Sequence, residues 1–306
     1  MDLQTKINEL NSQLIQKGLL ITTEKDINYG RQITVSDGHE QVPVNVYAGK
    51  KGITVTLGGS AASPLRKRLQ LIIAGGDPRE GELPPGLEGV EDFDGEWIGT
   101  DESGKGDFFG PLVVAAVQVD AKRAADLIAA GIKDCKVLSD DKVRHFAKEI
   151  RQICNGRYCE LELIPERYNS LYEQLTREGK NLNHLLAWAH ARVLEDVLNM
   201  APCRFAIADK FANESYIASR LMQKGRQITL VQTHKAERNI AVAAASVLAR
   251  ARFLARMEDM GSRYQVILPK GASQAVISAG KQFVKLHGRE ALKDVCKLHF
   301  KTLEQI

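Results

Sequence analysis

Trp97-Ile98-Gly99-Thr100-Asp101-Glu102-Ser103-Gly104-Lys105-Gly106-Asp107, continuing into Phe108-Phe109-Gly110-Pro111-Leu112-Val113-Val114, is the stretch that determines how this sequence folds. Two adjacent carboxylates end a short apolar strand, a lysine between two glycines follows, and a second apolar strand begins. Glycine allows a backbone to approach another group closely. Because neighbouring side chains of an extended chain point in opposite directions, Asp101 and Glu102 reach one ligand only if the strand ends or bulges here. The pattern is typical of a functional site rather than a solvated surface.

A phosphate-binding P-loop is the first alternative for residues 99–106. That motif needs Ser or Thr directly after its lysine to bind Mg²⁺ through the hydroxyl, and here the position is Gly106. A P-loop also collects N–H groups for anions, and Asp101 and Glu102 would bring two negative charges into it. The sequence therefore disfavours a nucleotide hydrolase.

The composition is that of a globular chain: 306 residues, 44% hydrophobic and 26% charged. This length accommodates two domains. No apolar run approaches the roughly 18 residues that a membrane span needs, and Met1-Asp2-Leu3-Gln4 lacks the basic and apolar regions of a signal peptide. The five cysteines form no C-x-x-C pair, which favours reduced thiols. We expect a cytoplasmic protein with no membrane partner.

The net charge of +4 is unevenly distributed. Residues 1–74 carry +3, residues 75–96 carry −7 and residues 97–306 carry +8. The acidic segment contains three prolines and six glycines, which predicts an extended linker between an N-terminal domain (1–74) and a C-terminal domain (97–306). Two basic domains suggest a polyanionic partner, although a generic basic surface explains the charge equally well.

The N-terminal domain is predicted to combine helices with an antiparallel sheet. Apolar spacing predicts a helix over 2–17, and turn residues separate β-rich runs. The expected elements are helices 2–17 and 63–74 and strands 20–23, 32–36, 42–48 and 53–57. Clustered cations in this domain are either phosphate contacts or a solvated basic face: Lys50, Lys51, Arg66, Lys67 and Arg68.

From Trp97 onward, strands alternate with helices, which predicts an α/β fold. The expected strands are 97–102, 112–119, 157–164, 205–208 and 230–233, and the expected helices are 121–130, 139–153, 183–200, 240–260, 273–286 and 290–303. The helix from Ile240 is rich in alanine on the face that must pack closely.

Two further carboxylates follow buried strands: Asp209 ends one, and Glu237 comes shortly after the next. If these strands share a sheet with Asp101 and Glu102, four like charges converge, and a divalent cation is the economical remedy. Oxygen ligands without a Cys–His set favour Mg²⁺ or Mn²⁺ over Zn²⁺. Taken singly, Asp209 is equally a turn residue paired to Lys210, and Glu237 a helix-start charge.

Other polar residues keep several interpretations open. His234 is a surface residue, a proton shuttle or a phosphate contact, and Lys105 is a phosphate contact or a loop charge. The remaining histidines considered, His184, His190, His287 and His299, are scattered and suggest no ligand set.

The stretch 101–113 resembles the opening motif of the type 2 ribonucleases H, and within that group the ribonuclease HIII branch. Lys235-Ala236-Glu237 and the alanine-rich run 241–250 resemble the same family's block of an acid followed by a helix. The resemblance covers about residues 97–306. An N-terminal domain similar in fold to the TATA-binding protein also fits the HIII branch.

The resemblance implies that Asp101, Glu102, Asp209 and Glu237 are catalytic metal ligands. It implies that Gly104-Lys105-Gly106 recognises the ribonucleotide and that Lys136 contacts the substrate backbone. Two departures matter: the fourth acid is Glu where the HII branch has Asp, and the family's Asp-Ser-Lys block reads Asp134-Cys135-Lys136.

The implied fold is a ribonuclease H-like mixed sheet flanked by helices. The implied reaction is metal-dependent endonucleolytic hydrolysis of the RNA strand of RNA–DNA hybrids, leaving 5′-phosphate and 3′-OH ends, in a monomer that serves DNA replication and repair. Two alternatives remain: HII-like cleavage at single ribonucleotides in duplex DNA, and a non-catalytic hybrid-binding protein.

Overall fold

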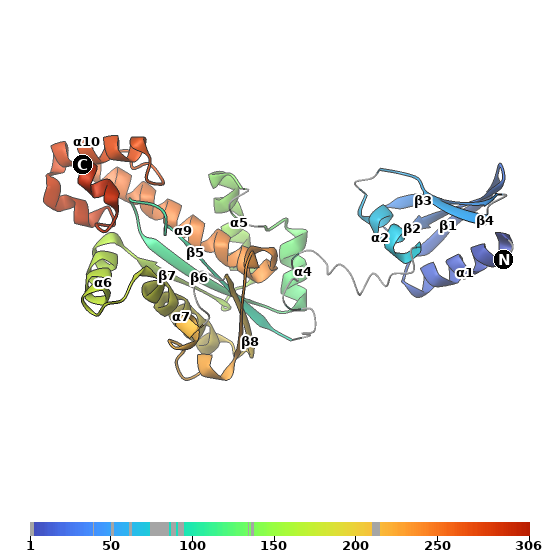
Figure 1. Ribbon diagram of the computed structural model, residues 1–306, viewed down its shortest axis with the longest axis horizontal. Coiled ribbons are helices and arrows are strands. Elements are labelled where there is room, and N and C mark those ends of the chain that lie inside the picture. Colours follow the sequence, from blue (N-terminus) through green and yellow to red (C-terminus); the bar gives the residue numbers. More distant parts are fainter. Residues whose placement is uncertain are drawn as a thin grey trace. The chain divides into compact units, whose positions relative to one another are not determined.

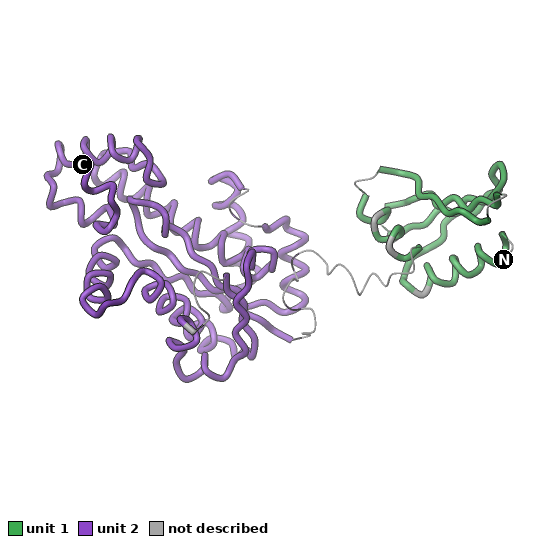
Figure 2. Tube along the Cα trace, viewed as in Figure 1, with its two compact units in different colours: residues 1–83 green, residues 84–306 purple. Residues whose placement is uncertain are grey.

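The computed structural model describes residues 3–38, 40–49, 52–60, 63–73, 86, 90, 95–133, 135, 138–209 and 215–306. The chain divides into two compact units, residues 1–83 and 84–306 (Figure 2). Most of the expected linker 75–96 lies outside the described residues, so its extended character stays a prediction. None of the described helices combines the length and the apolar character that crossing a bilayer requires.

The first unit is a four-stranded antiparallel sheet, in the order β1-β2-β3-β4, with two helices (Figure 1). Its elements are α1 (Leu3–Gln16), β1 (Leu20–Ile27), β2 (Gly30–Ser36), β3 (Gln41–Gly49), β4 (Gly52–Leu57) and α2 (Pro64–Ile73). Alternate residues of β2 and β3, among them Ile33, Val35, Val44 and Val46, are buried in a core of the unit's own. The expected helix-plus-antiparallel-sheet domain is confirmed, with β1 running four residues beyond its expected end.

The second unit is built on a five-stranded mixed sheet in the order β7-β6-β5-β8-β9. β5 pairs antiparallel with β6 and parallel with β8. The strands are β5 (Trp97–Ser103), β6 (Leu112–Val119), β7 (Tyr158–Leu163), β8 (Phe205–Asp209) and β9 (Thr229–Thr233). Every residue of β6 is buried, because this strand has neighbours on both edges and helices on both faces.

Helices cover both faces of this sheet (Figure 1). One face of the sheet packs against α9 and the shorter helices α4 and α5, and these elements share one hydrophobic core. The other face packs against α7 and forms a second hydrophobic core. The helices are α4 (Ala121–Ala129), α5 (Asp140–Ile153), α6 (Pro165–Arg177), α7 (Leu182–Met200), α8 (Ser215–Ala218), α9 (Ile240–Tyr264) and α10 (Gln274–His287). The expected mixed sheet flanked by helices is confirmed; α6 and α8 were not expected.

The central helix α9 packs against β5 at its closest point through a glycine. A Cβ added at Gly99 would lie 2.2 Å from the backbone nitrogen of Val242 and 2.8 Å from the Cβ of Ala241. Only a glycine opposite small residues permits this distance between a helix and a strand. The alanine-rich face of α9 is therefore used for close packing, as the sequence predicted.

The expected helix over 290–303 is wrong. The structure has two short 3₁₀ helices, η4 (Arg289–Asp294) and η5 (Lys301–Gln305), and between them Cys296 forms an isolated antiparallel bridge with Phe109. The backbone N–H of Lys297 donates to the carbonyl of Phe108, at 2.9 Å. Pairing with the segment after β5 replaces the hydrogen bonds that a continuous helix would make.

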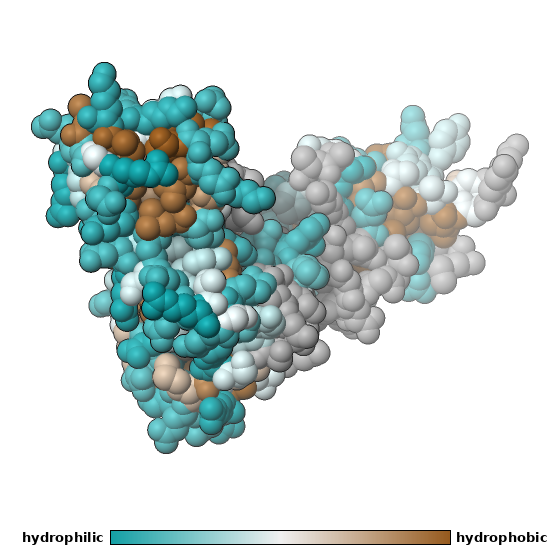
Figure 3. Space-filling model, turned by 60° about the vertical axis from the view of Figure 1, so that its left-hand side comes forward, coloured by the Kyte–Doolittle hydropathy of each residue, from teal (hydrophilic) through white to brown (hydrophobic). Residues whose placement is uncertain are grey.

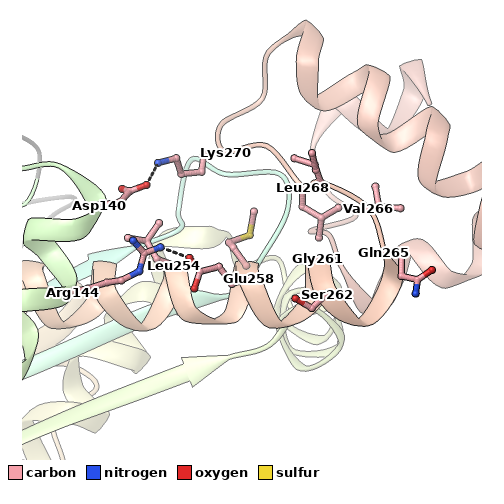
Figure 4. Close-up of a pocket in the computed structure, with 12 residues that line it drawn as sticks. Asp140, Arg144, Leu254, Glu258, Gly261, Ser262, Gln265, Val266, Leu268 and Lys270 are labelled. Carbon is pink, nitrogen blue, oxygen red and sulfur yellow. Dashed lines mark hydrogen bonds and ion pairs between the residues drawn. The ribbon is translucent and has the colours of Figure 1, made fainter.

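The surface of the second unit seen in Figure 3 is mainly hydrophilic, with hydrophobic area gathered near the C-terminal helices. A cavity of about 450 Å³ lies beside α9 and α5 (Figure 4). Two ion pairs cross it, Lys270–Asp140 at 2.7 Å and Arg144–Glu258. None of the four predicted carboxylates lines this cavity.

Candidate active site

Asp101 and Asp209 lie next to each other at one end of the sheet. In the parallel pairing of β5 with β8, Thr100 is opposite Ala208, and the next residues are Asp101 and Asp209. Trp97 and Ile207 belong to the core on the α9 side. Alternation along the two strands places both aspartates on that side as well. The parallel register therefore brings together two of the four carboxylates that the sequence predicted to converge.

Glu237 lies at the same end of the sheet, in the 3₁₀ turn η3 (Ala236–Arg238) between β9 and α9. The backbone N–H of Ala236 donates to Oδ1 of Asp209, at 3.4 Å. Two residues after Glu237, the side chain of Asn239 caps α9 and accepts a hydrogen bond from Nε1 of Trp97, at 3.0 Å. Asn239, which the sequence analysis did not select, thus fixes the start of α9, and with it Glu237, to β5.

Glu102 points to the opposite face of the sheet, toward α7. Its Oε2 lies 3.1 Å from Nε2 of His190, and the Nδ1 of this histidine lies 2.9 Å from Oγ1 of Thr100. His190 is completely buried. Burial raises the pKa of Glu102, but the hydrogen bond and charge of His190, together with Lys105, outweigh it and lower that pKa to about 2. Glu102 is therefore a carboxylate at neutral pH.

His190 was not predicted to belong to the site. It stands between alanines in the apolar helix α7, which favours a core residue, and only the sheet places it beneath Glu102. The other three scattered histidines have local roles. His184 closes the capping box of α7, His287 bonds the carbonyl of Tyr264, and His299 packs on Tyr172.

The two glycines of the loop Gly104-Lys105-Gly106 differ in whether the fold requires a glycine at their position. Gly104 has a φ of +91°, and a Cβ there would lie 2.1 Å from the carbonyl oxygen of Pro111. Gly106 is exposed, and a Cβ there would meet nothing within 4 Å. The fold therefore requires glycine at position 104 but not at position 106. At Gly106 the space beside the backbone is open, so a bound molecule can approach it.

This loop leads from β5 into an antiparallel strand, whereas a P-loop leads into a helix. The structure thus agrees with the rejection of a P-loop. The ammonium of Lys105 lies 3.5 Å from Oε1 of Glu102. His234 is exposed just after β9. Lys136 lies outside the described residues, and the thiol of neighbouring Cys135 accepts a hydrogen bond from Ser246 of α9.

All four predicted metal ligands are carboxylates, which is the donor chemistry that suits Mg²⁺ or Mn²⁺. Each is partly buried, at one end of three neighbouring strands. In the described part of the chain, however, no three His, Cys, Asp or Glu side chains are gathered closely enough to hold a metal ion. Glu102 is directed toward His190, on the other face of the sheet from Asp101 and Asp209.

The family model described as ribonuclease HII matches residues 98–303. Among curated proteins, a ribonuclease HIII of Protochlamydia amoebophila is 44% identical over 209 residues, 68% of this chain and 67% of that protein. A ribonuclease HIII of Chlamydia felis is 45% identical over 213 residues, 68% of this chain and 69% of that protein. The solved structure of Bst-RNase HIII in complex with Mn²⁺ is 28% identical, with a TM-score of 0.65, over 99% of this chain and 95% of that one.

Proposed function

This chain belongs to the ribonuclease HII family, among its ribonuclease HIII relatives, and we propose that its second unit hydrolyses the RNA strand of RNA–DNA hybrids by a metal-ion mechanism. The observation that carries the mechanism is the parallel register of β5 and β8. It brings Asp101 and Asp209 together, with Glu237 at the same end of the sheet and Glu102 next in sequence but on the opposite face. As a member of this family the chain is an endoribonuclease.

Asp101, Glu102, Asp209 and Glu237 are the residues that would hold the cation, Mg²⁺ or Mn²⁺. Such a cation supplies positive charge at the scissile phosphate and lowers the pKa of water. The Mn²⁺ complex of a related enzyme supports a divalent cation. His190 keeps Glu102 ionised and fixes its direction. Attack of water on phosphorus breaks the bond to the 3′ oxygen, which leaves as a 3′-OH while the phosphate stays on the 5′ end.

The loop Gly104-Lys105-Gly106 is proposed to recognise the ribonucleotide. RNA differs from DNA by its 2′-OH, which backbone groups can read if the sugar approaches closely. The open space at Gly106 supports this role, because the fold itself does not require glycine there. Lys105 and Lys136 would contact the substrate backbone.

The N-terminal domain predicted from the sequence, residues 1–74 of the first unit, is proposed to bind the hybrid through phosphate contacts, which supply affinity without reading sequence. We also propose a monomer that works in the cytoplasm, in DNA replication and repair. The net charge of +8 in residues 97–306 supports a nucleic-acid partner for the second unit too.

The test is Asp101→Asn, assayed on three substrates with Mg²⁺ or Mn²⁺: a long hybrid, duplex DNA with one ribonucleotide, and single-stranded RNA. We expect the unaltered protein to cleave the long hybrid best. We expect the variant to lose at least ~100-fold in rate because a cation ligand is gone, with hybrid binding almost unchanged. Asp126→Asn, at an exposed carboxylate of α4, is the matched control.

Undiminished cleavage by Asp101→Asn would disprove the carboxylate mechanism. Preference for the single ribonucleotide would favour HII-like specificity instead. Hybrid binding by the unaltered protein without cleavage under either cation would indicate a non-catalytic binding protein.

A further inference from the structure

Lys297 is a completely buried lysine, in the segment between η4 and η5 where the sequence predicted a helix. Its Nζ donates to two backbone carbonyls, that of Asp107 at 2.8 Å and that of Gly110 at 2.7 Å. Both acceptors belong to the segment that directly follows Gly104-Lys105-Gly106. The C-terminal segment is therefore bonded, through one side chain, to the loop proposed to read the sugar.

The amine of Lys297 lies in surroundings that make its desolvation unfavourable. The Nζ of Lys297 lies 5.7 Å from the centroid of the Tyr168 ring, from α6, and its hydrogen-bond acceptors are two backbone carbonyls rather than a carboxylate. Burial lowers the pKa of Lys297 to about 7, although Asp107 and Cys296 act in the opposite direction. An apolar side chain would fill the same volume without this desolvation cost. What only the amine supplies is the pair of hydrogen bonds to the loop.

Those two bonds join the ends of the turn 107–110, whose middle residues, Phe108 and Phe109, are completely buried. Backbone bonds reinforce the attachment: Gly110 N–H donates to Val295 and Lys297 N–H to Phe108, each at 2.9 Å. On the loop's other side, the carboxylate of Asp107 accepts from the N–H of Gly271, at 2.7 Å. The loop is thus anchored at its C-terminal end, one residue after Gly106, while Gly106 itself stays exposed.

We propose that Lys297 is a positioning residue for sugar recognition, which holds the carbonyls of Asp107 and Gly110 so that Gly106 meets the ribose at a fixed distance. This rests on the proposed role of the loop in reading the 2′-OH. Recognition through backbone groups tolerates little displacement, and a shift of about 1 Å costs on the order of a hundredfold in rate.

The test compares full-length protein with Lys297→Met, which keeps the chain length and removes both donors. Fluorescence anisotropy without divalent cation measures the affinity for a hybrid and for an all-DNA duplex of the same sequence, and steady-state assays give kcat and KM. We expect a roughly 10-fold loss of affinity for the hybrid, with DNA affinity unchanged, because only the sugar-reading contact is displaced. Hydrogen exchange in residues 104–110 should be faster in the variant.

Cys296→Ala is the matched control, since that side chain is equally buried beside Lys297 and makes no polar contact with the loop. It should keep the preference for the hybrid. Lys297→Gln retains one donor and should recover part of the preference; it also serves if the Met variant does not fold.

Equal losses of hybrid and DNA affinity, or an unchanged preference with a lower melting temperature, would mean that Lys297 is merely structural and would overturn the proposal. An unaltered protein without any preference for the hybrid would instead contradict the proposed function of the loop. The two failures are therefore distinguishable.

Discussion

At the scale of single residues, the histidine beneath Glu102 sets the direction of that carboxylate. His190 contacts Glu102 through Nε2 and Thr100 through Nδ1. The carboxylate of Glu102 can only accept a hydrogen bond, so Nε2 of His190 carries the proton of this contact. A histidine tautomer is commonly fixed in this way by the partner of its second nitrogen. Outer partners of this kind orient carboxylates that ligate metals.

We predict that His190→Leu raises the Mn²⁺ concentration for half-maximal cleavage by about 10- to 100-fold, because Glu102 loses the partner that fixes its direction. His190→Gln, whose amide can still donate to Glu102, should show a smaller rise. Calorimetric Mn²⁺ titration gives a readout that does not depend on turnover. His145→Gln, at an exposed histidine of α5, is the control, and an unchanged Mn²⁺ midpoint in the Leu variant would refute the positioning role.

At the scale of the elements, β7 is an edge strand that Glu162 connects to the central helix α9. The side chain of Glu162 is 9% exposed and bonds the guanidinium groups of Arg252, at 2.7 Å, and Arg256. Burial raises the pKa of this carboxyl, but the two arginines outweigh it and the pKa is lowered. The ionised form is therefore preferred more strongly in the folded than in the unfolded chain.

A carboxyl with a lowered folded pKa stabilises the fold above its unfolded pKa, and this contribution is lost as the pH falls through its folded pKa. We predict that Glu162→Gln costs about 1 kcal/mol at pH 7, a value kept small because both arginines are partly exposed. The difference from the unaltered protein should shrink as the pH falls below about 4.5. Urea unfolding followed by tryptophan fluorescence measures it in the second unit, because Trp97 and Trp188 both lie there.

Glu258→Gln is the control for this prediction, since Glu258 also pairs with an arginine across helices but is 63% exposed. Its effect should be smaller than that of Glu162→Gln. A cost at position 162 that is the same at pH 7 and pH 4 would show that lost packing, not lost charge, destabilises the variant.

The elements also show which parts of the structure local sequence patterns predict. Asp101 and Asp209 were found because each follows the apolar part of a buried strand, and the parallel pairing of β5 with β8 brings these two positions to the same end of the sheet, although β5 itself continues to Ser103. His190 and Lys297 were not found, because each owes its role to a partner about 90 or more residues away. The apolar spacing after Glu290 favours a helix locally, yet pairing of Cys296 with Phe109 overrides it. Contacts between distant segments leave no periodic signal in either segment.

At the scale of the whole molecule, each unit has a hydrophobic core of its own. Among the residues that the structure describes, the core of the first unit is formed by residues between 3 and 73, and the two cores of the second by residues from Val90 and from Ile98 onward. A unit with a separate core can fold without the other. The four carboxylates proposed to be catalytic all belong to the second unit. We therefore expect that truncation can separate hybrid binding, proposed for the first unit, from cleavage, proposed for the second.

We predict that deleting residues 1–74 raises KM for a long hybrid while leaving kcat within about twofold, because the second unit keeps its fold and all four carboxylates. Fewer phosphate contacts also release fewer counterions, so the dependence of affinity on salt should be less steep. Kinetics on one hybrid at several salt concentrations measure both quantities. An unaltered KM and an unaltered salt dependence would refute the proposal that residues 1–74 bind the hybrid.

Two arginines of α2 in the first unit, Arg66 and Arg68, differ in the contacts that their side chains make. Arg68 donates to the carbonyl of Lys17, at 2.7 Å, near the end of α1, so its removal would disturb the fold. Arg66, also on α2, makes no side-chain hydrogen bond or ion pair with the described residues, so it is the better probe of phosphate binding. Arg66→Gln in the full-length chain should raise KM in the same direction as the truncation and reduce the salt slope by about 1. If the truncation raises KM but Arg66→Gln does not, the first unit binds the hybrid through residues other than Arg66.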